Sequence, residues 1–166
     1  DMGCLCNPNN PTGQLIDREV LEQVADYCQK TDTCLLLDEC FHDFLEEGSV
    51  HTLLPRVKEN PKLFVLRAFT KMYGMAGLRL GYGICSDTEL IRRMEQVTQP
   101  WNVSVPAQAA GIAAAREQEF VAVSRQMITE QKKLLLAGLE AAGAKVYGSA
   151  ANYIFFRAAP GFDTRM

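Results

Sequence analysis

Three polar features of the sequence each come directly after, or end, a short apolar run. They are the loop at residues 7–13 with the sequence NPNNPTG, the carboxylate of Asp38, and the segment around Lys71. Short apolar runs are typical of strands, and ligands of open α/β sheets bind at the edge where the strands have their carboxyl ends. We therefore expect these three features to lie around one site at that edge.

Lys71 carries the group with the most direct chemical use. A lysine amine attacks a carbonyl when a nearby cation or an apolar pocket keeps it unprotonated, and Arg79 follows after a turn that contains glycines. Asp38 ends an apolar run, where a carboxylate without a partner is costly. Each feature also has a plainer interpretation: a solvated loop lysine, a helix cap or buried salt bridge, and a tight turn. Taken singly, each is better explained by the plainer interpretation, so only the combination indicates a site.

The sequence RAFTKMYGMAGLRLG at residues 67–81 resembles the cofactor-binding segment of class I and II aminotransferases, in which Ser/Thr-x-Ser/Thr-Lys is followed by glycines and Arg-x-Gly. The resemblance implies that Lys71 is the catalytic residue and forms a Schiff base with pyridoxal 5'-phosphate (PLP). It also implies that Thr70 and Arg79 hold the cofactor phosphate, Arg79 through a forked, charge-assisted contact. Ala68 departs from the pattern, because the family usually has a phosphate-binding hydroxyl at that position.

Two further motifs match the same family in the same order along the chain. Asp38 begins the sequence DECF, which resembles the family's Asp-Glu-x-Tyr/Phe. The resemblance implies that its carboxylate pairs with the protonated pyridine nitrogen and keeps the ring able to accept electrons. Asn10 directly precedes Pro-Thr-Gly and is implied to hydrogen-bond the phenolic oxygen of the cofactor. Phe41 is implied to lie at the cofactor too, but it lacks the hydroxyl with which the commoner tyrosine bonds the ring oxygen.

Strand-like runs alternate with segments of helical periodicity, which predicts an α/β architecture with a mostly parallel sheet. The predicted strands of this sheet are the apolar runs at residues 3–6, 34–37, 63–69 and 78–85. The run at 34–37 is continuously apolar, as expected for a strand buried on both faces. Two further strands, at 144–147 and 153–157, follow a long helix and predict a second, smaller unit.

The helices of the chain have recognisable boundaries. Asp17 is expected to cap the first helix, and Ser86 with Glu89 forms a capping box that predicts another. Ser104 begins a third helix, which is rich in alanine. The long helix is predicted at about residues 119–142 and ends at the glycine that follows.

Composition and charge favour a globular, cytoplasmic protein. The 166 residues carry a net charge of −3, and the lack of a basic stripe argues against a nucleic-acid partner. No apolar run approaches the roughly 20 residues of a membrane span, and no secretory signal opens the chain. The six cysteines match no zinc pattern and the two histidines have no ligand-spaced companion. We therefore expect reduced core cysteines and no metal site.

The resemblance also implies a domain organisation. Residues 1–117 would be the second half of a PLP-binding large domain of fold type I, and residues 118–166 the connecting helix and the beginning of a small C-terminal domain. The chain would then be a fragment without the family's glycine-rich phosphate turn, its ring-stacking aromatic residue and its substrate-binding arginine. The loop at residues 100–104 resembles one that reaches toward the active site of a partner subunit, which implies a homodimer in the intact enzyme and a small amino-acid substrate.

The sequence resembles two branches of the family, threonine-phosphate decarboxylase and histidinol-phosphate aminotransferase. The segments at residues 38–44, 66–71 and 100–103 look more like the decarboxylase branch. Both reactions would use Lys71 and differ in which bond to the substrate Cα is broken. The alternative is a non-catalytic fragment or scaffold that keeps the motifs without turnover. Because a PLP Schiff base is yellow, the colour after PLP is added separates a cofactor binder from an inert fragment.

Overall fold

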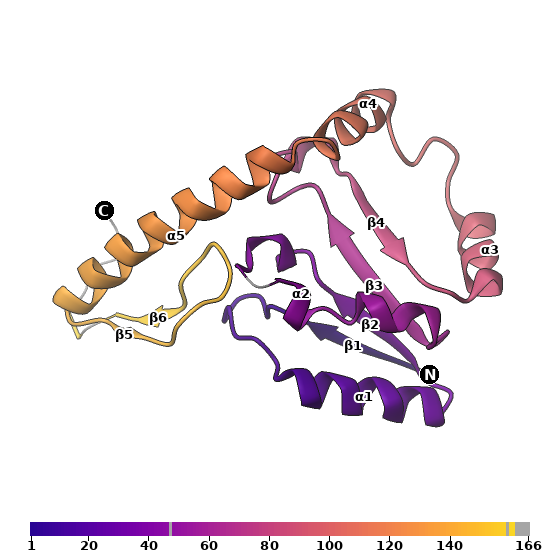
Figure 1. Cartoon of the computed structure of the whole chain (residues 1–166), viewed down its shortest axis with the longest axis horizontal. Coiled ribbons are helices and arrows are strands. Elements are labelled where there is room, and N and C mark those ends of the chain that lie inside the picture. The colour runs from indigo at the N-terminus through magenta and orange to yellow at the C-terminus, as the bar shows by residue number, and fades with distance from the viewer. Residues whose placement is uncertain (47, 159, 162–166) are drawn as a thin grey trace.

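The computed structural model describes residues 1–46, 48–158 and 160–161. The main sheet consists of four strands, in the order β1 (Met2–Cys6), β2 (Cys34–Asp38), β3 (Leu63–Ala68) and β4 (Gly81–Ile84) (Figure 1). Strands β1 and β3 run parallel to β2, and β4 runs antiparallel to β3. The predicted α/β fold with a mostly parallel sheet is therefore confirmed.

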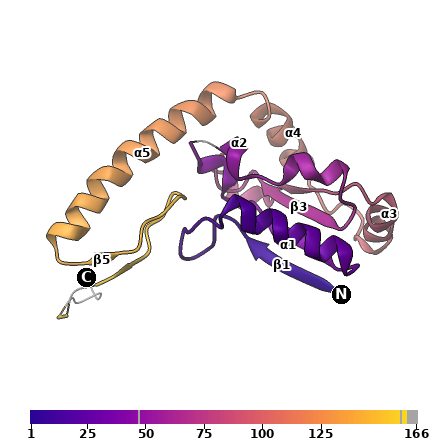
Figure 2. The same ribbon diagram turned by 60° about the horizontal axis from the view of Figure 1, so that its bottom comes forward.

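Helix α1 (Arg18–Lys30) covers one face of this sheet (Figure 2). Its residues Leu21, Ala25 and Cys28 recur at helical spacing and belong to a buried cluster that also contains Leu35, Leu37, Leu63 and Val65 from the strands. Burial alternates along β2, and Leu36 is only half-buried. The prediction that residues 34–37 are buried on both faces is therefore wrong, because α1 covers a single face.

The cap of α3 (Thr88–Val97) differs from the prediction by one residue. Asp87, not Ser86, is the N-cap, and its Oδ1 accepts hydrogen bonds from two backbone N–H groups at 3.0 Å each. Glu89 does not complete a capping box, because its carboxylate pairs with two arginines of its own helix. At α1 the prediction is confirmed, since the Asp17 side chain accepts a hydrogen bond from the N–H of Glu19 at 2.8 Å.

The strand predicted at residues 78–85 is shorter than expected. Leu78 lies in a 3-10 turn, η3 (Ala76–Leu78), and Arg79 has a left-handed φ of 55° that interrupts any extended run. The strand therefore begins only at Gly81, and its first three residues are exposed. Gly83 allows β4 to approach its neighbour, because a Cβ there would lie 2.3 Å from the Phe64 ring.

The chain between β2 and β3 forms three short helical turns, η1 (His42–Phe44), α2 (Gly48–His51) and η2 (Leu54–Lys58). After α3 come α4 (Val105–Ala114), which Ser104 caps as predicted, and the long α5 (Gln118–Ala141). Figure 1 shows α5 running away from the main sheet, with the chain returning along it. No helix in the described part of the chain is long and apolar enough to cross a membrane.

The return segment contains a second, antiparallel sheet of two short strands, β5 (Lys145–Val146) and β6 (Phe156–Arg157). Both strands are shorter than predicted, and residues 162–166 of the expected small domain lie outside the described residues. Because α5 begins at Gln118, the fold is compatible with a boundary after residue 117, but that domain division stays a prediction.

The expectation of core cysteines holds for one position. All six cysteines are free, but only Cys28 is buried. The pairing of β1 with β2 explains three of the others, because Cys4, Cys6 and Cys34 lie in register with residues on the face opposite α1. That face is less covered, so apolar sequence context alone did not determine their burial.

Candidate cofactor site

The predicted site residues follow neighbouring strands that share one carboxyl edge. Asn10 lies in the loop after β1, Asp38 is the last residue of β2, and Lys71 follows β3. The register pairs Cys6 of β1 with Asp38, and Asp38 with Leu66 of β3. The backbone therefore places the three features at the same edge, while their joint contact with one ligand stays a prediction.

Asp38 is held at this edge by both neighbouring segments. Its Oδ1 accepts a hydrogen bond from the N–H of Cys40 at 2.9 Å, and its carbonyl accepts one from the N–H of Asn7, also at 2.9 Å. The first of these is a local turn of the kind that aspartate favours. The alternatives considered for Asp38 were a helix cap and a buried salt bridge. The contact observed is a turn, and the buried salt bridge is made by its neighbour, Glu39.

Asn7 anchors the loop that carries Asn10, although no motif had singled it out. Its side chain is fully buried, with Oδ1 accepting from the N–H of Ile16 at 2.9 Å and Nδ2 donating to the carbonyl of His51 at 3.3 Å. Asn10 itself is exposed at the loop tip. A buried polar residue early in the loop thus fixes the backbone from which Asn10 projects.

Lys71 lies beside an aromatic cluster. Its Nζ is 5.4 Å from the centroid of the Phe41 ring, which is a cation–π distance. Phe41 is buried and meets the ring of Tyr153 edge-on, with the centroids 5.0 Å apart. Met72 belongs to the same cluster. Phe41 was predicted to lie at the cofactor without a hydrogen bond to it. In the structure its ring provides an apolar surface beside the Lys71 amine.

Thr70 and Arg79 line one pocket of about 430 Å³ together with Cys40 and Ala68. The Arg79 Nη1 donates a hydrogen bond to the carbonyl of Ala76 at 3.0 Å, which orients the guanidinium from within its own turn. The structure thus brings the two predicted phosphate-binding residues together. Lys71, Asp38 and Asn10 do not line this pocket. Cys40, whose N–H bonds the Asp38 carboxylate, does line it.

Cys40 and Cys6 lie between the predicted site residues, and the sequence had assigned both to the core. Burial raises the pKa of the Cys40 thiol to about 12, and its hydrogen bond to the Asp38 carboxylate acts in the same direction. Burial is also the main cause of the raised pKa of Cys6, whose Sγ donates to the carbonyl of Pro8 at 3.1 Å. Both are therefore neutral thiols beside the carboxylate.

The segment at residues 147–153 from the second unit docks onto the loop at residues 7–14. The hydroxyl of Tyr153 donates to the carbonyl of Asn9 at 2.7 Å, and the N–H of Ala150 donates to the carbonyl of Gly13 at 2.8 Å. A Cβ at Gly13 would lie 2.4 Å from Ser149 Oγ, so only glycine permits this approach. Sequence reasoning missed these residues, because no local motif connects positions so far apart.

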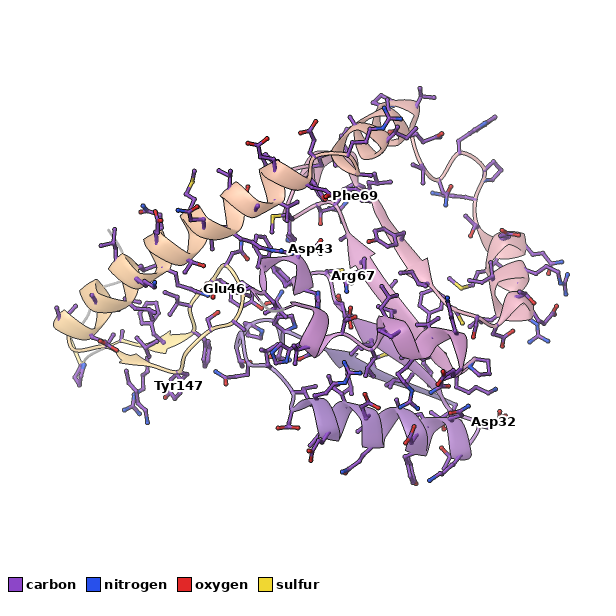
Figure 3. All side chains as sticks on the ribbon, viewed as in Figure 1. Asp32, Asp43, Glu46, Arg67, Phe69 and Tyr147 are labelled. Atoms are coloured by element: carbon purple, nitrogen blue, oxygen red, sulfur yellow. The ribbon has the colours of Figure 1, made fainter. Side chains whose placement is uncertain are left out.

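A buried ion pair joins β3 to the residue after Asp38. The Nη2 of Arg67 lies 2.6 Å from Oε2 of Glu39, and its Nη1 lies 3.1 Å from Oδ1 of Asp43. Figure 3 shows Arg67 and Asp43 in the middle of the molecule, between the main sheet and α5. Glu39 directly follows Asp38, and Arg67 precedes the segment of Lys71 on β3.

The mostly parallel α/β sheet, followed by a long helix and a second small sheet, has the fold of the PLP-dependent enzymes of fold type I. The family within that class is identified by the sequence as a whole. The chain belongs to the aminotransferase class I and II family, which its residues 3–161 match. The cofactor of this family is pyridoxal 5'-phosphate, as the motifs had predicted.

Named relatives come from both branches considered above. Threonine-phosphate decarboxylase of Salmonella typhimurium is 36% identical over 160 residues, which are 95% of this chain and 43% of that protein. Histidinol-phosphate aminotransferase of Brevibacillus brevis is 37% identical over 150 residues, 90% of this chain and 41% of that protein. The crystal structure of histidinol-phosphate aminotransferase from Clostridium acetobutylicum matches with a TM-score of 0.90 at 28% identity, covering 96% of this chain and 48% of that one. The chain spans less than half the length of each of them.

The residues at the site fit a phosphorylated pyridine aldehyde. An arginine and a threonine hydroxyl on the wall of one pocket suit a phosphate. An exposed lysine beside an aromatic ring suits an aldehyde, and a carboxylate at the end of β2 suits a protonated ring nitrogen. The donor set thus matches the three functional parts of PLP.

Proposed function

We propose that the protein containing these residues is a PLP-dependent enzyme that acts on an amino acid or amino-acid phosphate, with Lys71 as the attachment residue. The position of Lys71 carries the proposal: it follows β3 at the carboxyl edge, its Nζ lies over the Phe41 ring, and it directly follows Thr70, which lines the same pocket as Arg79. Threonine-phosphate decarboxylase and histidinol-phosphate transaminase are the candidate activities. The matches to relatives of both names support this pair.

Each residue has one proposed task. Arg79 and Thr70 bind the cofactor phosphate, Asp38 holds the proton at the pyridine nitrogen, and Asn10 bonds the ring oxygen. When bound, PLP supplies the electron sink for the bond that breaks at the substrate Cα. The Lys71 amine would hold the cofactor aldehyde, with loss of water. Once the substrate amine has taken its place, the free Lys71 amine would be positioned to carry a proton to or from that carbon. Phe41 supports the amine on its apolar side.

Of the two activities, we favour the decarboxylase. The motifs at residues 38–44, 66–71 and 100–103 resemble that branch, and the relative of that name aligns over 95% of the chain. Carbon dioxide release from threonine phosphate and amino transfer from histidinol phosphate, assayed on the full-length protein, decide between them. Amino transfer without decarboxylation would reverse the choice.

The attachment residue is tested by trapping. The chain is incubated with PLP, reduced with borohydride and digested, and the modified peptide is found by mass spectrometry. We expect the label at Lys71, loss of the visible absorption in Lys71→Ala, and no change in the matched variant Lys58→Ala, which removes an exposed lysine from η2. No colour and no labelled Lys71 peptide would instead support the non-catalytic scaffold.

We also propose that the intact enzyme is a homodimer located in the cytoplasm. The loop at residues 100–104 resembles one that reaches toward a partner's active site, and its Trp101 side chain is 95% exposed. An indole so fully exposed on a monomer is a typical contact residue of an interface. Light scattering of the full-length protein tests the assembly, and a monomer with full turnover would contradict it.

A further inference from the structure

We propose that a cluster formed by the buried Glu39 and Thr52, the largely buried Arg67 and the half-buried Asp43 positions Asp38 and Lys71 relative to each other, an inference that rests on the proposed function. We call these four residues the Arg67 cluster. Arg67 belongs to β3, and the other three belong to the connection between β2 and β3, which begins at Glu39. None of the four is proposed to touch the cofactor, so they are positioning residues and not catalytic ones.

The contacts of the cluster leave little freedom to either charged group at its centre. The Glu39 side chain is 0% exposed and that of Arg67 10% exposed. Glu39 Oε2 accepts from Arg67 Nε at 2.9 Å and from Thr52 Oγ1 at 2.8 Å, and Oε1 accepts from the N–H of Leu53 at 3.2 Å. Arg67 Nη1 also donates to Asp43 at 3.1 Å. The third nitrogen, Nη2, lies 2.6 Å from Glu39 Oε2. All three nitrogens of the Arg67 guanidinium therefore have a carboxylate partner.

Glu39 and Arg67 are each close in sequence to one of the two proposed site residues. Glu39 directly follows Asp38, and Arg67 stands four positions before Lys71 on the neighbouring strand. A hydrogen bond from the N–H of Glu39 to the carbonyl of Leu66 at 3.0 Å ties the two backbones at the same level. Fixing Glu39 against Arg67 therefore fixes the strand end of Asp38 against the segment that leads to Lys71.

Stability alone is a weak reason for such a cluster. A buried ion pair gains little over apolar residues of the same volume, because the charges must leave water. It does specify one geometry, since a guanidinium fork accepts its partners in fixed directions. A site that must hold a lysine and a carboxylate at opposite ends of one cofactor requires that kind of fixed geometry.

The test compares Arg67→Gln and Arg67→Lys with a matched variant, Arg56→Gln. Arg56 also binds two carboxylates, Glu22 at 2.5 Å and Asp26 at 2.7 Å, but it connects η2 to α1. Thr52→Val is a milder change that removes one hydrogen bond to Glu39 and keeps every charge. All variants are compared at a temperature where circular dichroism shows them folded.

Two readouts are followed in each variant. The first is amide hydrogen exchange at Cys40, whose N–H bonds Asp38, and at Gly74, whose N–H bonds the carbonyl of Lys71 at 3.2 Å. The second is the rate of borohydride trapping of PLP at Lys71. We expect about tenfold faster exchange at both amides and about tenfold slower trapping in the Arg67 variants. Thr52→Val should show the same pattern to a smaller extent, and Arg56→Gln neither effect.

The outcomes separate the inference from the proposed function. Arg67→Lys should not restore the wild-type values, because an ammonium cannot hold three partners in the geometry of the fork. Exchange that rises evenly over the chain, or equally in Arg56→Gln, would show a purely structural cluster and overturn the inference. Absence of Lys71 labelling in the wild-type chain would count against the proposed function. The hydrogen exchange at Cys40 and Gly74 would still show whether the Arg67 cluster positions the two segments.

Discussion

Cys40 shows how the surroundings of a single side chain determine which nucleophile is available at the candidate site. A thiolate beside the cofactor pocket would compete with the Lys71 amine for an aldehyde. Burial, with the nearby Asp38 carboxylate, raises the pKa of Cys40 to about 12, and only the thiolate is a strong nucleophile. The thiol therefore stays neutral near pH 7, and the amine meets no competition from it.

The reactivity of Cys40 provides a first prediction. At pH 8 a group with a pKa of about 12 has roughly one molecule in ten thousand ionised. We expect iodoacetamide to modify the exposed Cys4 well before Cys40, and both at similar rates in denaturant. Peptide mass spectrometry after timed quenching measures this. Equal labelling in the folded chain would show that Cys40 is not shielded.

The same raised pKa predicts a loss of stability at high pH. The unfolded thiol ionises near its ordinary value of 9.0 and the folded one near 12, so folding favours the protonated form. This contribution is complete below pH 9 and is lost as the pH rises from 9 to 12. Denaturant unfolding of Cys40→Ala should show a shallower fall of the unfolding free energy over that window than wild type. Parallel curves would contradict the assignment.

At the scale of elements, the start of α3 depends on one carboxylate. Asp87 accepts two backbone hydrogen bonds, while the neighbouring Ser86 is exposed. Removing an N-cap side chain costs about 1 kcal/mol of helix stability. We expect Asp87→Ala to lower the helical circular dichroism signal of α3 and its amide protection, and Ser86→Ala to leave both unchanged. The reverse result would restore the capping box predicted from the sequence.

The docking of residues 147–153 onto the loop at residues 7–14 depends on Gly13. An alanine there costs about 1–2 kcal/mol for the left-handed φ, and its Cβ would meet Ser149 Oγ at 2.4 Å. Gly74 is a matched control, with a φ of 64° and nothing within 4 Å of a Cβ. Gly13→Ala should therefore reduce the melting temperature more than Gly74→Ala, and adding Ser149→Gly should recover part of the difference. Equal decreases in melting temperature would mean that the close approach to Ser149 does not affect stability.

How far the sequence predicts such features depends on how local they are. The segment around Lys71 and the DECF motif at Asp38 are contiguous, so residue types and spacing were enough to find them. The strands β1 to β3 followed from apolar runs for the same reason. Tyr153 could not be found in this way, because its partner Asn9 is 144 positions away. The exposure of Cys6 depends on which sheet face α1 covers, and that is a property of packing and not of the run.

At the scale of the whole molecule, the described residues supply four groups to the proposed cofactor site. They are the Lys71 amine, the Asp38 carboxylate, the Asn10 amide and the Arg79 guanidinium proposed for the phosphate. The family's glycine-rich phosphate turn and ring-stacking aromatic residue have no counterpart in the motifs of this sequence. The chain spans less than half the length of its named relatives, and their activities are therefore only proposed for it.

We predict that these 166 residues alone bind PLP weakly and do not turn over substrate. Each missing charge-assisted phosphate contact costs about 1.5–3 kcal/mol, so two or three of them lower the affinity by orders of magnitude. Loss of substrate positioning removes up to about 7–11 kcal/mol of barrier reduction. An absorption titration with PLP, with Lys71→Ala as the control, measures the affinity. Tight binding that depends on Lys71, together with turnover, would show that these residues form a complete enzyme.

The docked segment also sets the order in which this site is completed. The hydrogen bond from Tyr153 to Asn9 closes a loop of 144 positions, and contacts so distant in sequence form slowly because chain entropy opposes them. The strands and α1 need no part of the second unit to form their cluster. A nascent chain can therefore fold its sheet early, but the loop of Asn10 gains its last support only after residue 153 has been synthesised. Cofactor capture would then follow the docking of this segment and not the formation of the sheet.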